Sequence, residues 1–276
     1  MSEHASWTAD PGTQLADGWE PGASDTLLRA YVDGFSDMCA DVAELVGGRV
    51  ERDETIVLAD AGSPAPYLNG AVVLRPLATG EVDAVVERAS RFFAAGNGGP
   101  WVLFSPLPLP SLHHLGLAPI GHPPFMIRAV GAPRREPPAD LEIVEVHDDT
   151  GLLQMETALR DFYPMPELGG QPPGSVLPPT LLAKPDYRWI LGLVDGAPVG
   201  TAMAHRTAHC VHVEWITSDP ARRGKGYGEA MTWEATLAWP DLPATLIASD
   251  AGRPTYERMG YLSALRVTLW GGIRQA

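Results

Sequence analysis

The sequence of 276 residues is poor in cysteine and in basic side chains. Its two cysteines, Cys39 and Cys210, are too few for a disulfide framework or a metal cluster, so both are read as small core residues and no metal is expected. The 20 lysines and arginines are outnumbered by 34 aspartates and glutamates, for a formal net charge of −14. Because phosphate contacts need a basic surface, this charge argues against a nucleic-acid partner.

Long apolar runs are also missing. No run approaches the roughly 20 residues of a membrane-spanning helix, and Met1-Ser2-Glu3-His4 lacks the basic and apolar regions of a secretory signal. The hydrophobic content of 45% is nevertheless enough for a core. We therefore expect a folded cytoplasmic protein without a membrane partner, built from one large domain or from two of ordinary size.

The most informative stretch is the glycine-rich run 223–228, Arg-Gly-Lys-Gly-Tyr-Gly. It lies between an apolar strand pattern at 211–216 and a helix pattern that starts near Glu229. A strand, a glycine-rich turn and a helix form an anion site, because the free N–H groups and the dipole of the helix N-terminus favour negative charge. Glycines also let the backbone approach a phosphate closely. The spacing matches neither the ATP P-loop nor the dinucleotide fingerprint.

Two further segments accompany this run in a fixed order. Upstream, residues 216–223 read Ile-Thr-Ser-Asp-Pro-Ala-Arg-Arg, and downstream, residues 249–261 read Ser-Asp-Ala-Gly-Arg-Pro-Thr-Tyr-Glu-Arg-Met-Gly-Tyr. Together with the glycine-rich run, they resemble the acyl-CoA-binding strand, the pyrophosphate loop and the tyrosine helix of the GNAT superfamily of N-acyltransferases. The resemblance covers about residues 140–272 and implies acetyl-CoA as co-substrate.

The resemblance implies a three-part acyl-CoA site. The backbone of strand 216–218 would pair with the pantetheine arm as an added strand, and the N–H groups of 223–229 would hold the pyrophosphate. Ser249 would lie beside the pantetheine, at a position where many members of the family have asparagine. The expected cofactor-binding residues are Ile216, Thr217, Ser218, Arg223, Gly224, Lys225, Gly226, Tyr227, Gly228, Glu229 and Ser249.

Acyl transfer to an amine needs a base for the amine proton and an acid for the leaving thiolate. The resemblance places the acid at Tyr256. Strand alternation puts Cys210, His212 and Glu214 on one face, which is expected to look into the cleft. The resemblance favours Glu214 as the base, acting directly or through water. His212 is expected as a substrate contact and is the alternative base.

The two halves of the chain repeat one another. A shift of 144 residues aligns 254–261 with 110–117, the strand 245–249 with 101–105, and the helix after the glycine-rich run with 82–95. Such self-similarity is typical of a duplicated domain. The first copy lacks the chemical groups, because the residues that face Arg223, Lys225, Gly226, Gly228 and Tyr256 are Thr79, Glu81, Val82, Ala84 and Leu112.

We therefore predict an α/β (α+β) protein of two GNAT-like mixed-sheet domains with helices on both faces. Residues 25–130 are expected to form a degenerate domain and residues 140–276 the catalytic one. Residues 1–24 are expected to be flexible, and the proline-rich stretch 131–139 to be a linker. A further Pro/Gly-rich segment at 163–184 is read as a substrate-side lid or as a simple surface insertion.

The predicted function is transfer of the acetyl group of acetyl-CoA to a primary amine of a small, cationic molecule, by direct attack in a ternary complex. The acidic composition fits attraction of such a substrate and equally fits solubility alone. The alternatives are a non-catalytic acyl-CoA or ligand sensor and acetylation of a protein or peptide amine. The chain is expected to be a monomer or a homodimer.

Overall fold

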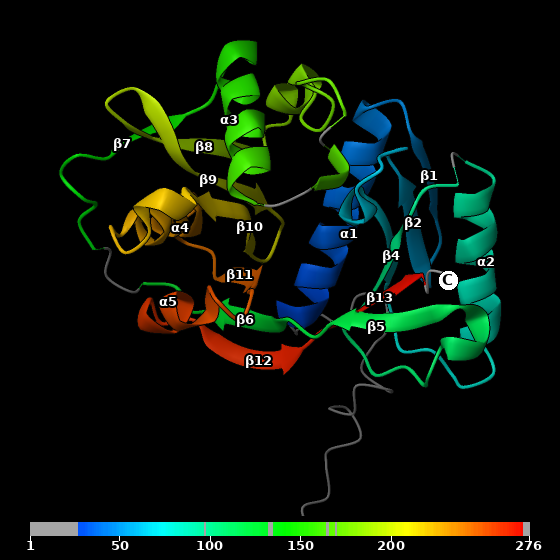
Figure 1. The fold of residues 1–276 in the computed structure, drawn as a ribbon. Coiled ribbons are helices and arrows are strands. Elements are labelled where there is room, and N and C mark those ends of the chain that lie inside the picture. Colours follow the sequence, from blue (N-terminus) through cyan, green and yellow to red (C-terminus); the bar gives the residue numbers. More distant parts are fainter. Residues whose placement is uncertain (1–26, 97, 132–134, 164–165, 169, 273–276) are drawn as a thin grey trace, which may run out of the picture.

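The computed structural model of the chain describes residues 27–272 except 97, 132–134, 164–165 and 169. The segment 1–24, predicted to be flexible, lies outside these residues. Two mixed β-sheets lie side by side, and helix α1 (Leu27–Leu45) lies between them and contacts strands of both (Figure 1). The sequence analysis did not predict this helix, which proves central to the site.

The first sheet has the strand order β1-β2-β3-β4-β13-β5. Only β3 and β4 pair in parallel; the other neighbours are antiparallel. Helix α2 (Val82–Ala94) packs against β2. The strands are β1 (Arg49–Arg52), β2 (Ile56–Asp60), β3 (Asn69–Val73), β4 (Val102–Ser105), β5 (Leu117–Gly121) and β13 (Thr268–Gly272).

The second sheet has the order β12-β6-β11-β10-β9-β8-β7, and again only one pair, β10 with β11, is parallel. Its strands are β6 (Pro124–Arg128), β7 (Glu142–Glu145), β8 (Tyr187–Val194), β9 (Ala197–Arg206), β10 (Val211–Ser218), β11 (Ala244–Ile247) and β12 (Leu262–Arg266). The helices of this half are α3 (Asp149–Phe162), α4 (Tyr227–Thr236) and α5 (Arg253–Arg258). Short 3₁₀ turns lie at Pro66–Leu68, His113–Leu115, Pro166–Leu168, Pro179–Ala183 and Pro220–Arg222.

Helices cover both faces of the second sheet, as predicted. Alternate residues of a strand point to opposite faces. On β8, Trp189 packs in the core that contains Leu152 and Met155 of α3, whereas Ile190 packs in the core that contains Met231 and Trp233 of α4. The protein is thus an α+β fold with two mixed sheets.

Six strands of the second sheet have the same order as the six strands of the first once one strand of each half is exchanged, and β7 is an additional edge strand of the second sheet. The 144-residue shift carries β6 onto β13. Nevertheless, β6 pairs between β11 and β12, and β13 pairs between β4 and β5. Figure 1 shows green β6 among the orange strands and red β13 among the blue and green ones. The exchange of strands is therefore reciprocal: β6 completes the second sheet and β13 completes the first.

This exchange corrects two expectations. The sequence analysis assigned residues 124–128 to the first domain and residues 268–272 to the second. In the structure residues 262–272 form two strands that are separated at Val267, which is fully buried and donates its N–H to the Pro123 carbonyl at 3.0 Å. The chain then enters the other sheet as β13. Because all these strands have apolar strand patterns, the sequence does not reveal which sheet each one joins.

Candidate active site

The predicted site lies where the parallel strands β10 and β11 part. They pair only at Val211 with Ala244 and at His212 with Thr245. Beyond these residues the β11 side of β10 has no strand partner among the described residues. An unpaired strand edge presents free N–H and C=O groups, so it can accept an extended ligand as an additional strand.

A bulge in β10 accompanies this separation. The pairing of β10 with β9 shifts between Glu214 and Thr217, and Trp215 has φ of 52°. A non-glycine residue in this region is strained, so surrounding contacts must hold it. The buried Thr201 hydroxyl donates to the Trp215 carbonyl at 2.8 Å and lies 2.7 Å from the Thr217 hydroxyl. Sequence analysis missed Thr201, which fixes the bulge from the neighbouring strand.

The space beside the bulge is a cleft of about 470 Å³. Its second-half wall contains most of the residues predicted for catalysis and for pantetheine. These lining residues are Val213, Glu214, Trp215, Ile216, Thr217, Ile247, Ala248, Ser249, Asp250 and Tyr256. The structure therefore brings together Glu214, Tyr256, Ile216, Thr217 and Ser249, although 42 positions separate the two catalytic candidates in the sequence.

Glu214 is partly buried in this cleft and accepts a hydrogen bond from Tyr31 Oη at 3.0 Å. Burial raises the pKa of Glu214 to about 7, against the opposing effect of the hydrogen bond from Tyr31. A carboxylate with a pKa near the working pH is suited to accept and release a proton. The first half thus supplies a direct partner to the predicted base.

Tyr256 lines the same cleft from α5. Burial, followed by the nearby charge of Glu214, raises its pKa well above the ordinary value of a tyrosine, so the phenol remains a proton donor at neutral pH. A Cβ at Gly252 would lie 3.0 Å from the Tyr256 ring, so the glycine allows the ring to pack closely against this turn. The Ser249 hydroxyl accepts from Gly252 N at 3.1 Å and fixes the turn that starts α5.

The glycine-rich run leads into α4 with the geometry of an anion site. Gly224 and Gly226 have φ of 78° and 87°, a conformation that side chains disfavour. The first intrahelical bond runs from Ala230 N to Gly226 O at 3.0 Å. Helix formation therefore leaves the N–H groups of Tyr227, Gly228 and Glu229 available to a ligand.

The side chains of this run have separate roles. Arg223 and Lys225 are exposed and form no ion pair within the described part of the chain. The buried Tyr227 side chain instead donates to Asp140 at 2.7 Å, and Glu229 pairs with Arg135 at 3.3 Å. Tyr227 and Glu229 can thus offer backbone groups to a pyrophosphate while their side chains anchor the loop to residues 135–140.

His212 lies apart from the cleft. It shares a face of β10 with Glu214, as predicted, but α1 covers this face at His212: a Cβ at Gly34 would lie 2.1 Å from His212 Nε2. The imidazole is 1% exposed, contacts the Tyr31 ring edge-on and lies 3.1 Å from the Thr245 hydroxyl. Burial lowers its pKa to about 3, so it stays neutral. These contacts give His212 a structural position, not one in the cleft wall.

The corresponding positions of the first half are filled by its own side chains. The Glu81 carboxylate accepts from Ala78 N at 2.8 Å and pairs with Arg75 at 2.8 Å, at the turn that leads into α2. Val82 and Leu112, which correspond to Gly226 and Tyr256, are almost fully buried in the first core. The half that lacks the glycines thus presents a carboxylate at the turn where the second half has its anion loop.

The opposite wall of the cleft comes mainly from the first half. Helix α1 contributes a stripe at helical spacing, and the turn before β3, strand β4 and the β5–β6 connection contribute the rest. The principal residues are Tyr31, Phe35, Met38, Cys39, Val42, Tyr67, Leu68, Phe104 and Ile120. Sequence analysis missed this wall, although the apolar periodicity of 31–42 carried a signal for it.

The Pro/Gly-rich segment 163–184 also reaches the cleft, through Tyr163 and Val176. The buried Glu156 carboxylate of α3 holds it by accepting from the N–H groups of Gly174, Val176 and Leu177 at 2.8–3.1 Å. The segment thus forms part of the wall, on the side predicted for the substrate.

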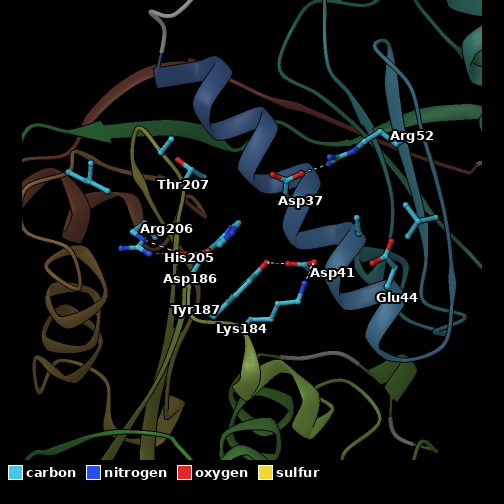
Figure 2. Close-up of a pocket in the computed structure, with 14 residues that line it drawn as sticks. Asp37, Asp41, Glu44, Arg52, Lys184, Asp186, Tyr187, His205, Arg206 and Thr207 are labelled. Atoms are coloured by element: carbon cyan, nitrogen blue, oxygen red, sulfur yellow. Dashed lines mark hydrogen bonds and ion pairs between the residues drawn. The ribbon is translucent and has the colours of Figure 1, made fainter. Parts of the chain in front are cut away.

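A second and larger hollow of about 950 Å³ lies between α1 and the β8–β9 hairpin (Figure 2). Six of its seven charged side chains form three pairs: Arg52 with Asp37, Lys184 with Asp41 at 2.6 Å, and Arg206 with Asp186 at 2.6 Å. Two of the acids are on α1, so Lys184 binds the second half to the first. None of the predicted site residues lines this hollow, and we place the candidate active site in the smaller cleft.

Within the described residues, no group of three or more His, Cys, Asp or Glu side chains is placed to hold a metal ion. A search of the same residues finds no helix with the length and apolar character required to cross a bilayer.

Comparison with known proteins agrees with this geometry. Residues 152–261 match the sequence model of the acetyltransferase (GNAT) family. No curated protein matches the chain. Among solved structures, a GCN5-related N-acetyltransferase from Kribbella flavida is 21% identical, with 86% of this chain and 95% of that chain covered and a TM-score of 0.62.

Two other structures also match over nearly the whole chain. A GCN5-related N-acetyltransferase from Sphaerobacter thermophilus is 15% identical, with 90% of this chain and 94% of that chain covered and a TM-score of 0.56. A conserved protein of unknown function from Staphylococcus epidermidis is 12% identical, with 90% and 98% covered and a TM-score of 0.59. At these identities the likeness shows the fold, which extends across both halves.

Proposed function

We propose that this chain, whose second half matches the acetyltransferase (GNAT) family, transfers the acetyl group of acetyl-CoA to a primary amine of a small molecule. The observation that carries the proposal is that Glu214 and Tyr256 line the same cleft. One group has a pKa near neutrality and the other stays protonated there. These are the proton acceptor and the proton donor that the reaction needs.

The co-substrate would lie along β10 and over the start of α4. The pyrophosphate would bind the free N–H groups of 227–229, with Arg223 and Lys225 supplying positive charge. The pantetheine arm would pair with the open edge of β10 at 216–218. The thioester would then reach the part of the cleft that Glu214 and Tyr256 line.

Transfer then proceeds in a ternary complex. Glu214 removes a proton from the bound ammonium, directly or through a water molecule, and the neutral nitrogen attacks the thioester carbonyl carbon. The new C–N bond forms as the carbonyl π pair moves to oxygen. When that pair returns, the C–S bond breaks, and the Tyr256 phenol donates its proton to the departing sulfur. The second proton of the nitrogen passes to the Tyr256 phenolate, directly or through water, which completes the amide and restores the phenol. Glu214 then releases its proton to solvent.

Release of free thiol from acetyl-CoA tests the proposal directly. Initial rates should be measured over a panel of amines that includes monoamines, polyamines, aminoglycosides, amino acids and peptides. At least one small amine should give one thiol for each acetylated product. Binding of acetyl-CoA without thiol release from any amine would favour the sensor alternative, and release with peptides alone would favour the peptide alternative.

A further inference from the structure

The acceptor side of the cleft is built from aromatic and aliphatic side chains. Tyr31 and Phe35 stack with ring centroids 5.6 Å apart, and Phe35 lies 4.5 Å from Phe104 by the same measure. Met38 and Val42 continue this face of α1 by one and two further turns. Phe35 is the partly exposed member of this set, and Tyr31, Met38, Val42 and Phe104 are buried around it. The wall therefore offers apolar contact area and few hydrogen-bonding groups.

The mouth of the cleft is apolar too. Tyr67, Ile120 and Tyr163 are each about half exposed, and all three line the cleft. Burial, followed by the nearness of the Tyr163 phenol, raises the pKa of Tyr67. Exposed apolar side chains that gather around one opening mark a surface that receives an apolar ligand.

Negative charge is scarce among the described residues that line the cleft. The only carboxylates are Glu214, which the reaction uses, and Asp250, which is largely exposed and pairs with Arg266 at 3.6 Å. A polyamine or an aminoglycoside carries several ammonium groups, and each needs a partner when it leaves water. The acidic excess of the chain is therefore not concentrated at the acceptor wall.

We propose, resting on the acetyltransferase function above, that the acceptor is a monoamine whose single ammonium group meets Glu214 while a flat apolar group, such as a phenyl ring on a short alkyl chain, lies against the accessible side chains of Phe35, Tyr67 and Ile120. The first half thus sets acceptor specificity. This narrows the sequence-based expectation of a small cationic molecule to a class with one charge and an apolar body.

The test compares 2-phenylethylamine, ethylamine and spermidine as acceptors. With free thiol release as readout, kcat/KM for 2-phenylethylamine should exceed that for ethylamine by about 10- to 100-fold, the effect of burying one phenyl ring. Spermidine should be the poorest acceptor per amine. The variant Tyr67→Ser at the mouth should lower kcat/KM for 2-phenylethylamine several-fold more than kcat/KM for ethylamine. The control Leu262→Ser, which removes a 69% exposed side chain outside the cleft, should change neither.

The outcomes separate this inference from the proposed function. Acetylation of spermidine as fast as 2-phenylethylamine would overturn the inference and leave the acetyltransferase function standing. If no amine releases thiol, the proposed function fails. In that case the apolar amine site is tested by calorimetric titration of 2-phenylethylamine into the CoA-loaded protein. Binding that Tyr67→Ser weakens and Leu262→Ser does not would support the site, and absence of binding would overturn it.

Discussion

The hydroxyl of Tyr31 donates a hydrogen bond of 3.0 Å to Glu214 Oε1, and this contact joins the two halves at the candidate base. Tyr31 lies on α1 and is fully buried, between Phe125 and the His212 ring. The duplicated half that lacks an anion loop therefore still reaches the reacting groups. It positions and tunes Glu214, in addition to forming the acceptor wall.

Replacement of Tyr31 by phenylalanine should shift the pH profile of kcat/KM to higher pH. The hydrogen bond from Tyr31 lowers the pKa of Glu214, so its loss raises that pKa above about 7. The base acts in its deprotonated form, so the acidic limb of log kcat/KM against pH should shift to higher pH by about one unit. The control Tyr187→Phe also removes a buried hydroxyl bonded to a carboxylate, that of Asp41, and should leave the profile in place. An unchanged pH profile in Tyr31→Phe would show that Tyr31 does not set the pKa of the base.

Removal of the Tyr256 hydroxyl should lower turnover. The variant Tyr256→Phe keeps the ring against Gly252 and deletes the proton donor, so kcat should fall by roughly 10- to 1,000-fold while the Kd of acetyl-CoA changes little. In the control Tyr261→Phe the deleted hydroxyl lies 2.6 Å from the Thr236 hydroxyl in the core. This control should therefore lower the Tm and keep most of the parent's kcat. Wild-type kcat in Tyr256→Phe would leave this residue a packing role.

The glycine-rich run should decide cofactor binding. Acetyl-CoA binds the folded state and should raise the Tm of the parent chain. The variant Gly226→Val introduces at this turn the residue that the first half has at Val82, and it should abolish the shift. The control Gly116→Val places the same side chain on a glycine with φ of 77° and open surroundings, so it should lower the Tm and keep the shift. Parent-like binding by Gly226→Val would contradict the loop assignment.

The strand exchange should make the two halves depend on each other. A fragment of residues 140–276 lacks β6, which pairs with both β11 and β12, and thus exposes two unpaired strand edges. We expect it to aggregate or self-associate in size-exclusion chromatography. The full chain should melt in a single calorimetric transition and bind one acetyl-CoA. A stable monomeric fragment that binds acetyl-CoA, or two cofactors per full chain, would contradict the interlocked arrangement.

Local signals in the sequence were sufficient to predict most secondary-structure elements of the second half and the second-half wall of the cleft. The glycine run, the Asp219–Pro220 turn and the tyrosine helix are contiguous segments whose geometry follows from nearby residues, and the structure places them around one strand pair. The internal repeat predicted that both halves share one architecture, and the strand order that six strands of each sheet have in common confirms it.

The remainder depends on contacts between distant residues. Tyr31 and Glu214 are 183 positions apart, and an apolar stripe on α1 does not reveal which sheet it covers. The same limit concealed the exchange of β6 and β13, because strand patterns fix the face of a residue but not the neighbouring strand. His212 was placed on the correct strand face, yet only the position of α1 shows that it is buried.

The most direct test of the account is the pH dependence of thiol release from acetyl-CoA by the parent chain and by Glu214→Gln, with 2-phenylethylamine as acceptor. The parent should gain activity through about pH 7 as the carboxyl group loses its proton. The variant should lose this limb and about 100-fold or more in kcat above pH 7, with its affinity for acetyl-CoA retained. A variant as active as the parent, with the same limb, would contradict the assignment of Glu214 as the base and of this cleft as the active site.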